Sequence, residues 1–116
     1  MALETSRFIQ GVFSFNGAGL QRALPLSPAV QYAVPFDKRT QLIYLRGGNS
    51  SAELIYLVLM RNGEPMRYFP IGAKGAVHVP LAIVEDVEPE SKLEILVGAP
   101  EGLTGQVLLD IGLVEV

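Results

Sequence analysis

Glycine and proline interrupt this chain at short intervals along its whole length, and this limits the regular structure it can form. Twelve glycines and eight prolines are spread over 116 residues. Proline breaks the interior of a helix, and glycine weakens it. Between the interruptions, no segment keeps its apolar residues at helical spacing. The sequence therefore predicts an all-β chain of short strands joined by turns.

Eight segments have the composition of strands, because they are rich in β-branched and aromatic residues and end at turn-forming residues. They are residues 7–15, 29–34, 40–46, 52–61, 66–71, 76–83, 92–98 and 105–116. We expect residues 16–28 to cross the surface, with at most a brief helical turn before Pro25 and Pro28. About eight strands in a chain of this length predict one antiparallel β-sandwich domain, jelly-roll-like, over residues 1–116.

The dipeptide Asn62-Gly63 gives the clearest local signal. Both residues tolerate positive φ, which a two-residue type I′ turn requires at its two central positions. The sequence therefore predicts a hairpin that joins residues 52–61 to residues 64–71. Pro65 and Pro70 cannot donate to a sheet ladder, so we expect the return strand to lie at an edge and its partner to be central.

The strand before this turn is apolar on both faces. One face carries Ile55, Leu57 and Leu59, and the other carries Leu54, Tyr56, Val58 and Met60. A two-layer sandwich covers only one face of each sheet. We therefore expect the second face to contact a loop or another subunit.

Composition points to another subunit. Charged residues make up 18% of the chain, well below the roughly 25% that is typical of soluble domains. Large exposed apolar patches are rare on monomers, so the sequence predicts a homo-oligomer, a dimer or higher. The residues predicted at the contact are aromatic and apolar side chains with an arginine rim: Tyr56, Val58, Met60, Tyr68 and Phe69, with Arg61 and Arg67.

Charge also bears on other partners. A net charge of −3 argues against nucleic acid, which generally requires a basic surface. Arg46, Arg61, Arg67 and Lys74 lie on or near the central hairpin. They could bind an acidic protein partner, although solvated strand ends explain them equally well.

Few residues suggest catalysis or a bound cofactor. The chain has no cysteine and one histidine, His78, so thiolate and multi-histidine metal sites are excluded. Asp110 interrupts an apolar strand, and we expect it to hydrogen-bond a loop. No cofactor is predicted, and we expect no enzyme activity. The weak metal candidates are the carboxylates Glu85, Asp86, Glu88 and Glu90, for which a solvated acidic loop is the favoured interpretation.

The opening residues, MALETSRF, lack the pattern of a signal peptide, and no apolar run is long enough to span a membrane. We therefore expect a cytoplasmic protein with no membrane partner. The favoured function is a non-catalytic, self-associating structural or protein-interaction module. The alternative is a small ligand-binding β-sandwich, for carbohydrate or calcium, that uses loops 84–91 and 99–105 at one end.

Overall fold

The computed structural model describes residues 4–116, except for the side chains of residues 82–85. Over that range the chain forms nine strands and one short 3-10 helix. In chain order they are β1 (Thr5–Asn16), β2 (Gly19–Pro25), η1 (Pro28–Val30), β3 (Tyr32–Ala33), β4 (Thr40–Asn49), β5 (Ile55–Arg61), β6 (Glu64–Ile71), β7 (Ala76–Val87), β8 (Lys92–Ala99) and β9 (Thr104–Glu115). No helix in this part of the chain is long and apolar enough to cross a bilayer.

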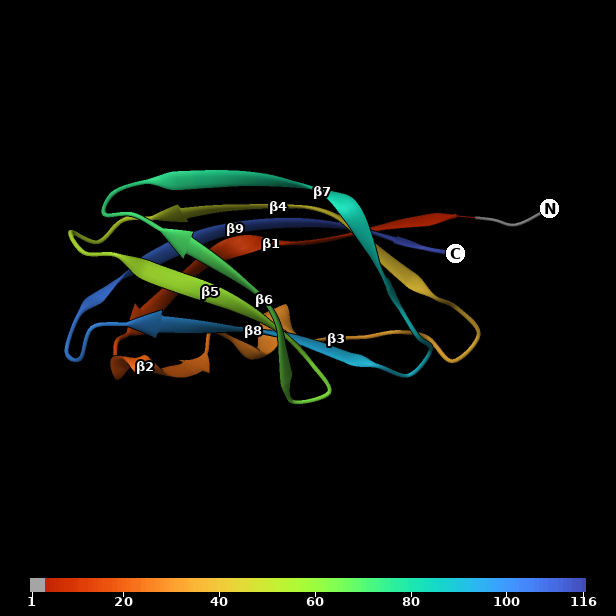
Figure 1. Ribbon diagram of the computed structural model, residues 1–116, viewed down its shortest axis with the longest axis horizontal. Coiled ribbons are helices and arrows are strands. Elements are labelled where there is room, and N and C mark those ends of the chain that lie inside the picture. The colour runs from red at the N-terminus through yellow and green to blue at the C-terminus, as the bar shows by residue number, and fades with distance from the viewer. Residues whose placement is uncertain (1–3) are drawn as a thin grey trace.

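The strands form two antiparallel sheets that pack face to face (Figure 1). Sheet I has the order β1-β9-β4-β7, and sheet II has the order β2-β8-β5-β6, with β3 also paired to β8. Most connections pass from one sheet to the other, so neighbouring strands are distant in the sequence. This arrangement is typical of jelly rolls. The predicted antiparallel β-sandwich is therefore confirmed.

The core lies between the inner faces of the two sheets. From sheet II, the alternating residues Ile55, Leu57 and Leu59 are at most 2% exposed. From sheet I, alternating residues of β9 such as Leu109 and Ile111 are each 1% exposed. Because side chains alternate along a strand, one apolar residue in two is enough to fill this layer. The inward row predicted for β5 is confirmed.

The hairpin at Asn62-Gly63 is also confirmed. Asn62 has φ 51° and Gly63 has φ 82°, which are the positive values a type I′ turn needs. The return strand β6 contains Pro65 and Pro70 and lies at the edge of sheet II, with a register irregularity near the turn. Its partner β5 lies inside the sheet, between β6 and β8. Proline thus marked the edge correctly.

Residues 16–34 differ from the prediction. The expected surface excursion contains β2, which pairs with β8 at Leu24 and Pro25. The strand predicted over 29–34 is instead the 3-10 helix η1 followed by the two-residue strand β3. The helix begins where Ser27 Oγ accepts the Ala29 N–H at 3.1 Å, with Pro28 in the first turn. A capping serine followed by proline favours a helical turn, and it overrides the strand propensity of the next residues.

A buried polar cluster joins the two sheets. The hydroxyl of Tyr32, on β3 of sheet II, donates to Glu115 Oε2 at 2.5 Å and lies 2.9 Å from Thr40 Oγ1. Glu115 and Thr40 belong to sheet I and are 3% and 0% exposed. Arg7 Nε donates to Glu115 Oε1 at 3.1 Å. Burial and the Glu115 hydrogen bond raise the pKa of Tyr32 to about 12, and the Tyr32 hydrogen bond lowers the pKa of Glu115.

Candidate functional site

The outer face of sheet II holds four of the residues predicted at a subunit contact. Tyr56, Val58 and Met60 alternate along β5, and Tyr68 lies opposite Val58 on β6. Tyr68 is exposed, but Val58 is only 2% exposed. The Tyr56 hydroxyl donates to the Leu20 carbonyl at 2.7 Å, and its ring centre lies 5.6 Å from that of Tyr68. The chain's own side chains therefore cover much of this face.

The other three residues of that predicted contact point to the opposite side of the sheet. Phe69 pairs with Leu57, is 4% exposed and belongs to the core. Arg67 pairs with Leu59, and Arg61 shares the face of Leu59 because it lies two residues further along β5. Neighbours in a strand face opposite ways, so Phe69 cannot join Tyr68 in one contact. This corrects the predicted set, which is divided between the two faces of sheet II.

The basic residues proposed for an acidic partner are also divided. Arg46 lies on β4 of sheet I, Arg61 and Arg67 lie on the hairpin of sheet II, and Lys74 lies in the turn between β6 and β7. Arg46 forms an ion pair with Asp110 of its own chain. These residues therefore do not form one basic surface. An acidic protein partner stays a prediction.

The weak metal candidates do not come together in the described part of the chain. Asp86 Oδ2 accepts a hydrogen bond from Arg39 Nε at 3.0 Å. Glu88 and Glu90 are exposed near the turn before β8, and the Glu85 side chain lies outside the described residues. Among those residues, no group of three or more His, Cys, Asp or Glu side chains is placed to hold a metal ion.

The two loops predicted to form a ligand site at one end of the sandwich are far apart. Residues 88–91 come directly before β8 and residues 100–103 directly after it, so the loops lie at opposite ends of that strand (Figure 1). Eight strand residues span roughly 25 Å. The prediction of one site built from both loops is therefore wrong.

A polar row crosses all four strands of sheet I on its outer face, which we call the open face. In the ladder register Gln10 lies opposite Asp110, Asp110 opposite Arg46, and Arg46 opposite His78. Gln10 Nε2 and the Tyr44 hydroxyl donate to Asp110 Oδ1 at 2.9 and 3.0 Å, and Arg46 Nε donates to Oδ2 at 3.1 Å. Asp110 therefore bonds to neighbouring strands and not to the loop that was predicted.

These contacts favour the charged form of Asp110. The hydrogen bond from Gln10, supported by Arg46 and Tyr44, holds the pKa of Asp110 below its usual value although burial opposes this. Burial and the hydrogen bond to Asp110 raise the pKa of Tyr44. His78 lies edge-on to Tyr44, with ring centres 6.2 Å apart. His78 is exposed on the sheet surface, as predicted.

Apolar side chains flank the polar row on both sides. Phe8 is 60% exposed on one side, and Val12 and Leu108 are 59% and 56% exposed on the other. Ile43 joins them at 40% exposed, because an irregularity between Leu42 and Tyr44 turns it outward. Four of the eight large apolar residues exposed in the described part of the chain therefore lie on the open face.

A shallow hollow lies in this face beside the polar row. A Cβ atom on Gly112 would meet Tyr44 Cε2 at 2.1 Å, so the tyrosine ring lies directly over the glycine. The hollow measures about 160 Å³, and its wall consists of Ser6, Phe8, Ile43, Tyr44, Gly112, Leu113 and Val114. Its wall includes the exposed Phe8 ring and Tyr44, whose hydroxyl bonds to Asp110 in the polar row.

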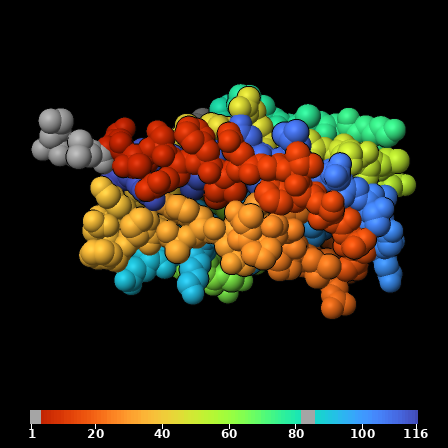
Figure 2. All heavy atoms as spheres, turned by 180° about the vertical axis from the view of Figure 1, so that it is seen from behind, coloured from red at the N-terminus to blue at the C-terminus, as the bar shows by residue number. Residues whose placement is uncertain are grey.

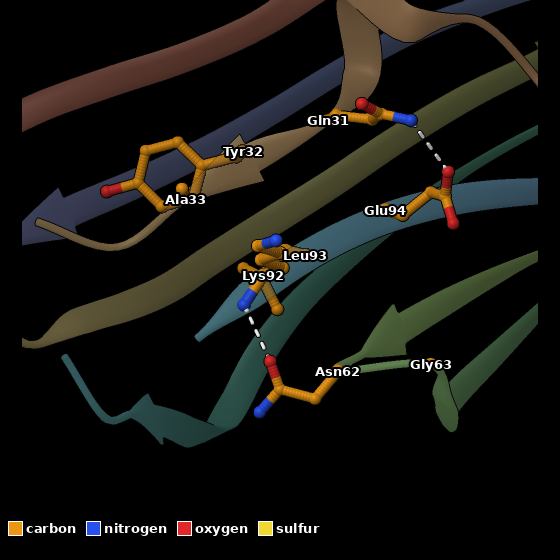
Figure 3. A pocket seen from close by; sticks show the side chains of 8 residues that line it. All are labelled: Gln31, Tyr32, Ala33, Asn62, Gly63, Lys92, Leu93 and Glu94. Atoms are coloured by element: carbon orange, nitrogen blue, oxygen red, sulfur yellow. Dashed lines mark hydrogen bonds between the residues drawn. The ribbon is translucent and has the colours of Figure 1, made fainter. Parts of the chain in front are cut away.

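A larger hollow of about 540 Å³ opens where β3, β8 and the β5–β6 turn meet (Figure 3). Gln31 Nε2 donates to Glu94 Oε2 at 2.9 Å on one side of it. On the other side, Asn62 Oδ1 accepts the main-chain N–H of Lys92 at 2.9 Å. Tyr32 directs its hydroxyl to the buried cluster between the sheets. None of the large apolar residues exposed in the described part of the chain lines this hollow, whereas four lie on the open face, so the open face is the stronger candidate site.

Sequence reasoning found single members of the open face but not the row. Asp110 and His78 were each noted as an isolated residue, and Arg46 was noted only as one of four basic residues. Gln10 and Asp110 are 100 residues apart, and only the strand order brings them together. The available signal was a carboxylate inside an otherwise apolar strand, because a charge in that setting needs polar partners on the strands beside it.

Comparison with known proteins identifies the fold. No family model matches the sequence, and no curated protein matches it. Among solved structures, the chain is similar to the CBM36-1 domain of a multidomain xylanase from the hindgut metagenome of Trinervitermes trinervoides, with TM-score 0.57, 16% identity, and 95% of this chain and 96% of that chain covered. It is also similar to a carbohydrate-binding module CBM36 in complex with calcium and xylotriose, with TM-score 0.58, 16% identity, and coverage of 93% and 97%.

A third similar structure comes from infectious bursal disease virus, Gx strain, with TM-score 0.52 and 15% identity over 97% of this chain and 32% of that chain. At these identities the likeness concerns the fold alone. The chain therefore shares its β-sandwich with carbohydrate-binding modules and with a viral protein, and its function has to be argued from its own surface.

Proposed function

We propose that this chain is a non-catalytic β-sandwich interaction module that self-associates through the surface of sheet I. The observation that carries the proposal is the exposure of Phe8, Val12 and Leu108, each more than half exposed on one face. Contiguous apolar patches are rare on monomers and mark interaction surfaces. Bringing Phe8 and Val12 into contact with a second copy removes apolar area from water, which gains about 25 cal/mol per Å². These exposures favour a contact on sheet I over one around Tyr56 and Val58 on sheet II, where Val58 is 2% exposed.

The polar row supports a role in binding without catalysis. Both oxygens of Asp110 accept hydrogen bonds, and its lowered pKa makes it a poor general base. The row instead resembles the polar component of a protein interface, where charge complementarity fixes orientation. A cytoplasmic location stays a prediction.

The oligomeric state tests this proposal. Light scattering after size exclusion should give a mass of two or more 12.5 kDa chains at micromolar concentration. Dilution should shift the mass toward one chain, because association follows mass action. A single-chain mass at every concentration up to the solubility limit would end the proposal.

A second candidate function is carbohydrate binding at the open face. The observation that favours it is the hollow where the exposed Phe8 ring and Tyr44 lie beside Gln10, Asp110 and Arg46. Aromatic rings stack on the apolar faces of sugars, and amide, carboxylate and guanidinium groups pair with hydroxyls. The likeness to modules that bind sugars makes the candidate worth testing, although no group of three or more His, Cys, Asp or Glu side chains among the described residues is placed to hold a metal ion.

Isothermal titration calorimetry with xylotriose, carried out with and without calcium, tests this candidate. Binding should be weakened by Phe8→Ala. The matched control is Phe36→Ala, which removes an aromatic ring that is 78% exposed but lies in a loop away from the open face. Equal heats for both variants, or no heat with xylotriose and other oligosaccharides, would exclude sugar binding at this face.

A further inference from the structure

Strand β1 is an open edge of sheet I. It is a 12-residue strand that pairs with β9 along its whole length, and within residues 4–116 no strand pairs with its other side. Figure 2, which views the molecule from behind, shows β1 in red running along the surface with no other segment over it. A long edge of this kind presents unpaired main-chain N–H and C=O groups to a further strand.

The other edges described in the structure are protected against such pairing. β7 contains Pro80 and an interrupted register. β6 contains Pro65 and Pro70, and β2 ends at Pro25 after a register shift. Prolines and bulges are the devices by which natural sheets prevent edge pairing. β1 has a continuous register and contains no proline.

The hydrogen-bond pattern shows which β1 residues face outward. Gly17 N donates to the Leu103 carbonyl at 2.7 Å, and Val116 N donates to the Arg39 carbonyl at 2.8 Å. Antiparallel ladders alternate, so the first bond directs the N–H groups of odd-numbered β1 residues to β9. The second bond, on the opposite side of β9, directs even-numbered β9 residues to β4 and leaves the odd-numbered ones to bond odd-numbered β1 residues, which agrees with the first. Even-numbered residues, including Gln10 and Val12, therefore direct their N–H groups to the open edge.

We propose that β1 pairs antiparallel with β1 of a second copy, joining two copies of sheet I into one continuous eight-stranded sheet. The inference rests on the proposed function of self-association and names the strand that performs it. The twofold axis passes between the two copies of Gln10, so Gln10 of one copy lies opposite Gln10 of the other. Phe8 then lies opposite Val12 of the second copy, and Val12 opposite Phe8.

This register suits a second copy because the strand is self-complementary about Gln10. Phe8 and Val12, the two most exposed apolar residues of β1, meet each other on both sides of the axis. Aromatic and β-branched residues are favourable cross-strand pairs. The only charged residue within β1 is Arg7, which is bound to Glu115 and lies opposite Phe13 of the second copy, so no like charges meet. The paired strands are roughly 40 Å long, enough for an extensive contact.

Val12→Pro tests the edge. It removes an outward N–H without breaking a bond to β9, so the circular dichroism spectrum should stay that of the wild type while the mass falls to one chain. Val12→Thr, which keeps the N–H group and the branched shape, is the matched control and should retain the wild-type mass. If Val12→Pro stays oligomeric while Leu108→Asp becomes monomeric, the faces stack and the edge proposal is wrong, although self-association stands. A monomeric wild type would overturn both.

Cross-linking gives a second measurement that does not depend on a proline variant folding. The chain contains no cysteine, so a single one reports its own contacts. In the proposed register Gln10→Cys places two Cα atoms about 5.5 Å apart, within the 4.4–6.8 Å or so that disulfides span. Oxidation should give a covalent dimer. Ser14→Cys is the control, because its two copies lie roughly 27 Å apart. Equal cross-linking of both variants, or none at Gln10→Cys in an oligomeric sample, would exclude this register.

Discussion

The outer faces of the two sheets both carry apolar side chains, but the exposure of these side chains differs between the sheets. On sheet II, Val58 is 2% exposed, because Tyr56 and Tyr68 lie beside it and Tyr56 is tied to the Leu20 carbonyl. On sheet I, Val12 and Leu108 remain 59% and 56% exposed. An apolar strand therefore does not by itself mark an intermolecular contact. The contact is expected where the chain leaves its apolar residues uncovered.

The largest expected effect comes from the same substitution on each face. Val58→Asp places a carboxylate where the chain leaves 2% exposure, and an unpaired buried charge should lower the free energy of unfolding by about 3–5 kcal/mol. Val12→Asp places the carboxylate in solvent and should lower the free energy of unfolding of the monomer by less than about 1 kcal/mol. Urea unfolding, at protein concentrations low enough to dissociate any oligomer, measures the loss of stability in both variants. Equal losses would show that the two faces do not differ in the way described.

The sequence predicted the elements of this comparison better than their arrangement. Alternation placed Tyr56 and Val58 on one face of the 53–61 strand, and Asn62-Gly63 predicted the hairpin, because both signals are local. What covers Val58 depends on β2, whose Leu20 carbonyl holds Tyr56, and β2 was missed. Its register with β8 shifts between Gly19 and Leu24, so it lacks a regular strand pattern.

The candidate site was predictable only in part for the same reason. Phe69 could have been excluded from the predicted contact by alternation alone, since it follows Tyr68 directly. The row from Gln10 to His78 could not have been assembled, because it needs the order of four strands that are distant in the sequence. Pairwise strand order is a long-range property, whereas periodicity and turn residues are local.

The next largest effect is expected at the cluster that joins both sheets. Tyr32→Phe leaves Thr40 and the carboxylate of Glu115 buried with one partner fewer, which should cost about 1–3 kcal/mol. Because Tyr32 lies on β3 and not in the proposed β1 contact, the variant should keep the wild-type mass. A loss of stability coupled to a change of mass would mean that the cluster also shapes the intermolecular contact.

The pH dependence identifies Tyr32 itself. Its pKa is about 12 in the folded chain and about 10 when unfolded, so ionisation favours unfolding. The stabilisation is fully present below pH of about 10 and is lost as the pH rises through about 12. Tyr32→Phe should flatten the alkaline limb of a stability–pH curve measured with urea. An unchanged alkaline limb would contradict the assignment.

A smaller difference is expected between two glycines that lie beneath tyrosine rings. A Cβ atom on Gly98 would meet Tyr56 at 2.1 Å, and one on Gly112 would meet Tyr44 at the same distance. Gly98→Ala should cost about 1 kcal/mol or slightly more, because the displaced ring uncovers Val58. Gly112→Ala should cost less, because Tyr44 can turn into solvent on the open face. Thermal unfolding measures the loss of stability in the two variants. A larger loss for Gly112→Ala would contradict the claim that the outer face of sheet II is covered and that of sheet I is open.

The smallest effect is expected for Asp110→Asn in the polar row. Solvent screens the pair with Arg46, whose side chain is 55% exposed, so the loss of stability at neutral pH should be smaller than in the comparisons above. The folded pKa of Asp110 is lowered, chiefly by the Gln10 hydrogen bond, so its contribution is present above the unfolded pKa of about 3.9 and is lost as the pH falls below it. The variant should therefore lose less stability than the wild type between neutral pH and pH of about 3. Glu115, whose pKa is also lowered, keeps part of the acid limb in both proteins. If the two curves run parallel through the acid range, Asp110 does not hold its charge through the row, and the open face is less organised than its hydrogen bonds indicate.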